Sequence, residues 1–195
     1  MSEPKRRMGS LDSAMAQSML TATEEVLKEE GYASLTSRRV AEYIGVKQRL
    51  VYYYFATMDD LIIESFRRLA IRELERLKSS VSSEQPLHAI WDVGINTADS
   101  RLVAEFMALA YRNEGLRLEV AKFIEEARDF QVAAIRKALG SNAAKDLKPV
   151  ALALLGSSVA LAMNREAAIG VTKGHQTVKR LIKSFCDELE SPASP

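Results

Sequence analysis

Side chains that can bind a nucleic acid are concentrated between Thr36 and Phe55, in the run TSRRVAEYIGVKQRLVYYYF. Arginine and lysine donate to phosphates and to guanine, glutamine can bind adenine through two groups, and tyrosine phenols donate to phosphates. From Leu35 to Ala56 the chain carries four cations and one acid, a local charge of 4 − 1 = +3, whereas the whole chain carries +1. These residue types favour a surface that contacts DNA.

Two short helices separated by a tight turn would position these side chains. Thr36 can accept hydrogen bonds from the first amides of a helix, and Leu35 and Val40 have the spacing of a hydrophobic staple. Gly45 can adopt the left-handed backbone conformation that ends many helices. The second helix must begin two or three residues later, so the spacing predicts a helix-turn-helix motif, whose second helix fits a major groove about 12 Å wide.

The outward side chains of this motif are the candidate DNA contacts, because Val51 and Phe55 belong to the core at helical spacing. The side chains expected to hold phosphates are Thr36, Arg39 and Tyr52. Those expected to reach base edges are Arg38, Gln48, Arg49 and Tyr53. Leu50 could contact a thymine methyl group, and Lys47 could reach either a phosphate or a base.

With these positions identified, the sequence resembles the TetR family of transcriptional regulators from roughly Leu11 to Leu69. The matching positions are Gly31-Tyr32, Leu35-Thr36, Val40-Ala41, Gly45-Val46, Val51 to Phe55 and Leu61. Lys47 and Arg49 stand where the family usually has small residues, so this recognition helix is bulkier and more basic. Met58 replaces a lysine that commonly grips a phosphate, so we do not transfer that contact to this chain.

The resemblance implies a homodimer whose two heads read the half-sites of a near-palindromic operator in double-stranded DNA. It further implies a repressor that is released when a small apolar or amphipathic molecule binds its second part. The alternative is a helical protein-interaction or adaptor module that uses the same Arg and Tyr side chains without binding DNA. The salt dependence of binding distinguishes the two hypotheses, because affinity for DNA falls steeply with added salt through counterion release.

The composition predicts an all-α protein of about nine helices. The chain has 195 residues, 47% of them hydrophobic, with only nine Gly and five Pro, and no stretch shows sustained β-branched alternation. We expect a flexible basic arm at residues 1–10, a helix-turn-helix domain at 11–56, a connecting helix at 57–80, a ligand-binding and dimerisation domain at 81–190, and a tail at 191–195. In the arm, Lys5, Arg6 and Arg7 could be solvated or could reach phosphates or a minor groove.

Helical periodicity and turn residues predict the helices outside the helix-turn-helix motif. The expected ranges are Leu11–Glu30, Met58–Ser80, Leu87–Thr97, Ala98–Asn113, Leu116–Leu139, Asp146–Ile169 and Gly174–Glu190. Ser10 or Asp12 is expected to cap the first of these, and four glutamates, Glu24, Glu25, Glu29 and Glu30, are expected on its solvent face.

Large apolar side chains of the second part could form an ordinary core or line a ligand cavity between helices. They are Trp91, Phe106, Met107, Tyr111, Phe123, Phe130 and Met163. Three polar side chains, Arg101, Asn164 and Arg165, could orient a ligand. The apolar stripes of the last two helices could cover their own subunit or face a twin pair in a four-helix bundle, which we favour. The stripe residues are Leu152, Leu155, Val159, Val178, Leu181, Ile182 and Phe185.

Little in the sequence supports an enzyme. Cys186 is the only cysteine, His88 and His175 are the only histidines, and no phosphate-binding loop or nucleophile elbow is present. We therefore expect no catalytic residue, no metal and no cofactor. No apolar run approaches the roughly 18 residues of a membrane span, so we expect a cytoplasmic protein that has no membrane partner.

Overall fold

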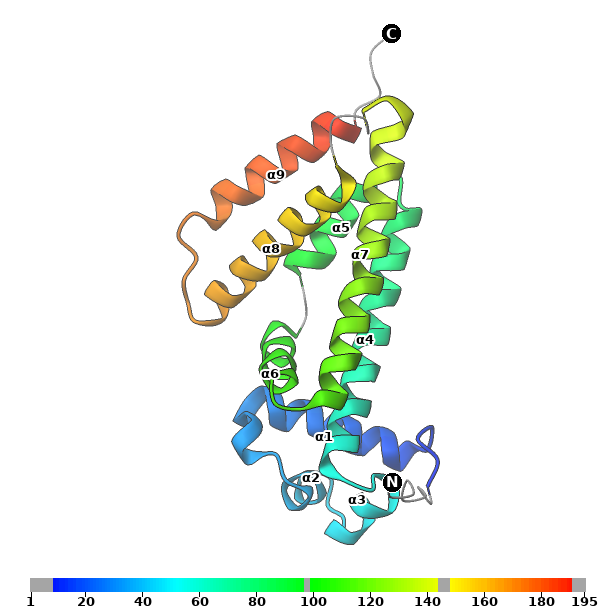
Figure 1. Ribbon diagram of the computed structural model, residues 1–195. Helices are drawn as coiled ribbons and strands as arrows, with labels where there is room; N and C mark the ends of the chain where they lie inside the picture. Colours follow the sequence, from blue (N-terminus) through cyan, green and yellow to red (C-terminus); the bar gives the residue numbers. More distant parts are fainter. Residues whose placement is uncertain (1–8, 97–98, 144–147, 191–195) are drawn as a thin grey trace. The chain divides into compact units, whose positions relative to one another are not determined.

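The computed structural model describes residues 9–96, 99–143 and 148–190, and all regular structure in these ranges is helical (Figure 1). The α-helices are α1 (Ala14–Glu30), α2 (Ser37–Tyr43), α3 (Gln48–Tyr54), α4 (Met58–Ser82), α5 (Pro86–Ile95), α6 (Ser100–Ala110), α7 (Glu114–Ala143), α8 (Pro149–Ala168) and α9 (His175–Glu190). A short 3-10 helix, η1 (Tyr32–Ser34), joins α1 to α2 and was not predicted. The all-α prediction is confirmed, whereas the predicted basic arm at Lys5, Arg6 and Arg7 and the tail at 191–195 lie outside the described residues.

Local side chains account for most of the helix ends. The first helix begins later than expected because Ser13, rather than Ser10 or Asp12, accepts a hydrogen bond from the Ala16 N–H at 3.2 Å. Pro86 and Pro149 occupy the first turns of α5 and α8, where a missing N–H costs nothing.

Two glycines near the ends of α7 have different conformations. Gly115 lies inside the first turn of α7 and is not a junction. At Gly140 the backbone leaves helical geometry, with φ of 59° and ψ of −167°, so the regular part of α7 ends close to the predicted Leu139. A positive φ of this kind is accessible to glycine without a steric penalty.

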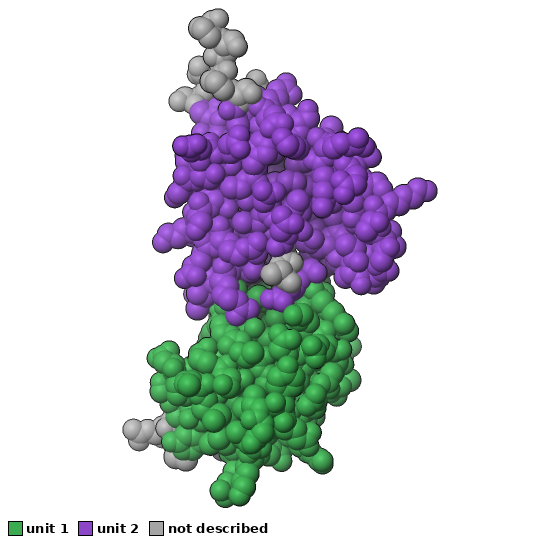
Figure 2. All heavy atoms as spheres, turned by 180° about the vertical axis from the view of Figure 1, so that it is seen from behind, with its two compact units in different colours: residues 1–70, 101–121 green, residues 71–100, 122–195 purple. Residues whose placement is uncertain are grey.

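The chain forms two compact units (Figure 2). Unit 1 comprises residues 1–70 and 101–121, and unit 2 comprises residues 71–100 and 122–195. The division passes through α4 and α7, so each of these long helices contributes to both cores. The predicted functional boundaries at residues 56, 80 and 190 remain predictions.

Unit 1 has a continuous apolar core beneath the helix-turn-helix motif. Its fully buried side chains include Met19 and Leu27 of α1, Val40 of α2 and Phe55 after α3. Farther along α4, the Phe66 ring meets Phe106 of α6 edge to face, at 5.4 Å between ring centroids. The buried Val40 and Phe55 anchor the helix-turn-helix motif in this core.

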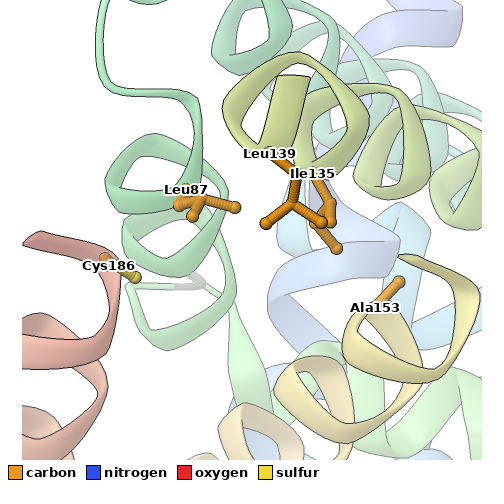
Figure 3. Close-up of a cluster of buried hydrophobic side chains, with 5 residues drawn as sticks. All are labelled: Leu87, Ile135, Leu139, Ala153 and Cys186. Atoms are coloured by element: carbon orange, nitrogen blue, oxygen red, sulfur yellow. The ribbon is translucent and has the colours of Figure 1, made fainter. Parts of the chain in front are cut away.

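Unit 2 is organised around a cluster to which four helices contribute (Figure 3). Leu87 comes from α5, Ile135 and Leu139 from α7, Ala153 from α8 and Cys186 from α9. Helix α5 packs against both α8 and α9. Within the described residues no helix combines the length and the apolar character that crossing a bilayer requires.

Candidate nucleic-acid interface

The helix-turn-helix motif forms where the sequence predicted it. The Thr36 hydroxyl accepts a hydrogen bond from the Arg39 N–H at 3.1 Å and caps α2. Gly45 has a φ of 70°, and the Val46 N–H returns to the Ala41 carbonyl at 2.9 Å, which closes the C-terminus of α2. Helix α3 starts at Gln48, so both predicted turn signals are confirmed.

Helix α3 buries one side and exposes the other. Val51 is 1% exposed and Phe55 is 0% exposed, and they anchor the helix in the unit 1 core. The exposed side chains are the predicted ones, Lys47, Gln48, Arg49, Tyr52 and Tyr53, with Leu50 half-buried beside them. Their exposure agrees with the expected orientation, and their contact with DNA remains a prediction.

The two arginines of α2 are held by carboxylates. Arg38 Nε donates to Glu42 Oε1 at 2.7 Å, one turn away on the same helix. Arg39 donates from two nitrogens to Glu30, at 2.5 Å from Nη2 and 3.0 Å from Nε to Oε1, and its guanidinium lies 5.6 Å from the Tyr43 ring centroid. The hydrogen bond from Arg39 lowers the pKa of Glu30, so this carboxylate is ionised over a wide pH range. A phosphate must compete with these acids for either arginine.

Two α3 side chains share a partner that sequence reasoning missed. Ser37 is 4% exposed, and its hydroxyl lies 2.8 Å from Gln48 Nε2 and 3.0 Å from the Tyr52 hydroxyl. A small polar residue between Thr36 and Arg38 was the only available signal, and it does not say which element it faces. Helix α2 therefore supports the exposed face of α3 through polar as well as apolar contacts.

Lys47 and Arg49 are the most available cations of the motif. Both are exposed, and among the described residues neither side chain has an ion-pair or hydrogen-bond partner. They occupy the two positions that make this recognition helix more basic than is usual in the family that the sequence resembles. Their charge can be used for DNA without breaking an existing contact.

The described chain begins beside α3. A Cβ at Gly9 would collide with the Tyr54 ring, and the Tyr53 ring lies on the same side. The two rings meet edge to face at 5.1 Å between centroids. The rings of Tyr53 and Tyr54 thus leave no room for a side chain at position 9.

Glu24 does not lie on the solvent face of α1, contrary to expectation. It is 8% exposed and accepts a hydrogen bond from Arg68 of α4 at 2.9 Å. Its charge can be buried because the guanidinium lies beside it. Only the packing of α4 on α1 shows this.

The predicted pocket residues belong to different units. Phe106, Met107 and Tyr111 lie in unit 1, and Trp91, Phe123, Phe130 and Met163 lie in unit 2. Tyr111 is 87% exposed just after α6, so its assignment to the interior is wrong. Phe106 is fully buried against Phe66.

Among the three polar residues proposed to orient a ligand, Asn164 already has a structural role. Its side-chain amide donates to the Gly94 carbonyl at 2.8 Å and ties α8 to α5, while Arg101 and Arg165 are exposed. A cavity lined by the apolar residues remains a prediction.

The predicted dimer face divides into internal and external residues. Leu152 and Ile182 pack against the cluster of Figure 3, and Val159 and Val178 are half-buried. Leu155, Leu181 and Phe185 are 63%, 69% and 42% exposed. Leu154 of α8, which was not among the predicted stripe residues, is 51% exposed.

The two histidines of unit 2 link helices. His88 of α5 lies 2.9 Å from Asp187 and 2.5 Å from Glu190 of α9, and His175 lies 2.8 Å from Glu166 of α8. Burial raises the pKa of Cys186 to about 11, so its thiol is protonated at neutral pH. In the described parts of the chain, no group of three or more His, Cys, Asp or Glu side chains could hold a metal ion.

Comparison with known proteins agrees with the family resemblance seen in the sequence. Residues 19–64 match the model of the bacterial regulatory proteins of the tetR family, and this range contains the whole helix-turn-helix motif. No curated protein matches the chain.

Three solved structures share the fold at low sequence identity. A TetR transcription regulator from Haloarcula marismortui is 21% identical, with a TM-score of 0.74 over 88% of this chain and 96% of its own. A transcriptional regulator from Rhodococcus sp. is 20% identical, with a TM-score of 0.68 over 88% and 95%. A proposed transcriptional regulator from Saccharomonospora viridis, solved in complex with choline, is 14% identical, with a TM-score of 0.76 over 90% and 97%. Residues 19–64 therefore match the tetR-family model, and the chain shares the fold of these regulators.

Proposed function

We propose that the protein is a sequence-specific DNA-binding repressor that reads a near-palindromic operator in double-stranded DNA. Regulators of this family are transcription factors rather than enzymes. The observation that carries the proposal is the exposed face of α3, where Lys47, Gln48, Arg49, Tyr52 and Tyr53 stand on a helix anchored by buried apolar residues. Such a face offers cationic, amide and phenolic donors on one rigid element, which suits a major groove.

The contacts with DNA divide into two groups. We assign the Tyr52 and Thr36 hydroxyl protons to phosphates. We assign Gln48, Arg49 and Tyr53 to base edges. Leu50 is available to a thymine methyl group. Lys47 can reach either group. Arg38 and Arg39 contribute when a phosphate replaces Glu42 or Glu30 as their partner. Because Arg39 is held by two hydrogen-bonded nitrogens, we assign it the weaker net contribution.

A homodimer supplies the second head. A single small head buries only about 600–1,000 Å² of protein surface on DNA, and two heads on half-sites one helical turn apart double that contact. The exposed Leu154, Leu155, Leu181 and Phe185 of α8 and α9 are the apolar surface that we assign to the partner subunit. A four-helix bundle would bury them across a two-fold axis.

We further propose that a small molecule controls DNA binding by entering the second part of the chain. We assign residues 11–56 to DNA reading, 57–80 to a connecting helix and 81–190 to ligand binding and dimerisation. The choline bound to the Saccharomonospora viridis regulator, which shares this fold, supports a small amphipathic effector. The unit 2 side chains assigned to it are Trp91, Phe123, Phe130 and Met163. For each tenfold loss of DNA affinity, the effector must favour the released state by about 1.4 kcal/mol.

The test is selection of bound sequences from random duplex DNA by the purified protein at two salt concentrations. A two-fold symmetric consensus whose affinity falls with added salt is expected. A Gln48→Ala/Arg49→Ala variant serves as the control, since it keeps Val51 and Phe55 but loses two base-reading side chains. Enrichment at neither salt concentration would refute the proposal and favour a protein-binding head instead.

A further inference from the structure

Ser37 is a buried polar residue within an otherwise exposed polar surface. It lies in the first turn of α2 and is 4% exposed, whereas Tyr52 of α3 is 49% exposed. Its Oγ lies 2.8 Å from Gln48 Nε2 and 3.0 Å from the Tyr52 hydroxyl. One hydroxyl on α2 therefore contacts two exposed side chains on α3, which are one helical turn apart.

The three side chains form a hydrogen-bond chain, and the available protons decide which group donates at each step. An amide nitrogen can only donate, so Ser37 Oγ accepts from Gln48. The Ser37 proton then donates to the Tyr52 oxygen, because leaving a buried hydroxyl proton without an acceptor is costly. The chain runs from Gln48 through Ser37 to Tyr52, and the Tyr52 proton remains as a donor at the exposed end.

Gln48 and Tyr52, at the two ends of the hydrogen-bond chain, each keep the groups that their DNA partner requires. Gln48 keeps its carbonyl oxygen and one N–H, which are the two groups that bind adenine in the major groove. Tyr52 keeps a donor proton, which suits a phosphate oxygen. Hydrogen bonds in such a chain polarise one another, so an anionic acceptor at Tyr52 strengthens the bonds behind it.

We infer that Ser37 is a positioning residue that couples base selection by Gln48 to phosphate contact by Tyr52. The inference rests on the proposed DNA-binding function and deepens it. Ser37 touches no DNA itself, since it is buried between α2 and α3. It holds the Gln48 amide in one orientation and directs the free proton of Tyr52 outward.

The test compares Ser37→Ala with the wild-type protein on the selected consensus duplex and on duplexes that each change one base pair. We expect Ser37→Ala to weaken consensus binding about tenfold, because the Gln48 and Tyr52 side chains would then have to be ordered when DNA binds. Discrimination should fall mainly at the base pair where Gln48→Ala also loses it, and Ser37→Ala should add little in the Gln48→Ala background. Ser79→Ala is the matched control, because this exposed α4 serine bonds only its own helix at Glu75.

A second measurement keeps the inference testable if Ser37→Ala folds poorly. In a cycle of Gln48→Ala and Tyr52→Phe, made with Ser37 intact, the combined loss of affinity should be smaller than the product of the single losses. Independent effects would overturn the coupling. So would a Ser37→Ala profile that matches wild type, or one that is weakened equally at every base pair. If wild type itself selects no consensus, the proposed function fails first.

Discussion

The side-chain hydrogen bonds of Arg68 lead to a quantitative prediction for the stability of unit 1. Arg68 of α4 donates from Nε to Glu24 at 2.9 Å, and from Nη1 to the Gln17 carbonyl and the Thr21 hydroxyl, both at 3.1 Å. The side chains of Arg68 and Glu24 are 21% and 10% exposed. A single guanidinium thus ties α4 to two turns of α1 inside unit 1.

Arg68→Met removes the guanidinium and keeps most of the aliphatic stem. Breaking a buried ion pair by removing one partner costs about 3–5 kcal/mol, because the other charge stays desolvated. The partial exposure of Arg68 places the expected loss at the lower end, about 3 kcal/mol. Arg68→Met with Glu24→Leu removes both charges, and its stability should return to within about 1 kcal/mol of wild type.

The assay is unfolding by denaturant and by heat at a fixed protein concentration, because dimerisation makes stability depend on concentration. A loss of about 3 kcal/mol corresponds to roughly 6–12 °C in Tm for a chain of this size. Arg67→Met is the matched control, since the neighbouring Arg67 is 45% exposed where it pairs with Glu64 and Glu119. The Glu64 and Glu119 side chains are 12% and 24% exposed, but water screens a guanidinium this accessible, so these pairs should contribute about 0–1 kcal/mol.

Two results would refute this reasoning. Arg68→Met could prove no more destabilising than Arg67→Met, which would mean that the Glu24 carboxylate is solvated in the protein. Alternatively, the double variant could remain as unstable as Arg68→Met, and the loss would then come from packing of the stem and not from a desolvated charge.

The other predictions concern DNA reading, assembly and thiol chemistry. Arg49→Ala should cost about 1–3 kcal/mol of DNA affinity and relax preference at one base position. Tyr52→Phe should weaken binding to every sequence and also reduce preference at the base pair that Gln48 reads, because the two side chains share Ser37. Competition titrations that show no change for Arg49→Ala would mean that α3 is wrongly oriented on DNA. Leu155→Glu combined with Leu181→Glu should give a folded monomer by light scattering, since both side chains are exposed and apolar, at 63% and 69%; a persistent dimer would place the interface elsewhere. Iodoacetamide should alkylate Cys186 slowly in the native protein at pH 8, because burial raises its pKa from 9.0 to about 11, and rapid alkylation would contradict that burial. The same shift means that stability falls as pH rises from about 9 toward 11, where the unfolded thiol ionises first.

The helix-turn-helix motif was predictable because its signals are local. A hydroxyl before α2 and a glycine after it act on backbone groups within three to five residues, so Thr36 and Gly45 do the same work in any tertiary context. The exposed and buried sides of α3 also follow from periodicity, since Val51 and Phe55 are four residues apart. Periodicity therefore predicts correctly that Lys47, Gln48, Arg49, Tyr52 and Tyr53 are exposed, whereas Arg39 and Leu50 are half-buried.

Contacts between elements could not be predicted in the same way. Glu24 and Arg68 are 44 residues apart, and Arg39 and Glu30 are nine apart across η1, so neither pair follows from helical spacing. Glu24 was expected in solvent because an isolated helix offers no partner for it. Tyr111 was expected in the interior because aromatic residues are usually buried, whereas α6 ends before this residue.

Sequence alone determined the helical class, the helix-turn-helix motif and the residue types that face outward from α3, since these depend on composition, period and backbone caps. Tertiary structure decided which outward side chains are already engaged. It holds Arg38 and Arg39 on carboxylates, leaves Lys47 and Arg49 available, and joins Gln48 to Tyr52 through Ser37. The physical reason is that hydrogen bonds and ion pairs depend on distances of about 3 Å, and only the packing of one helix on another sets such distances.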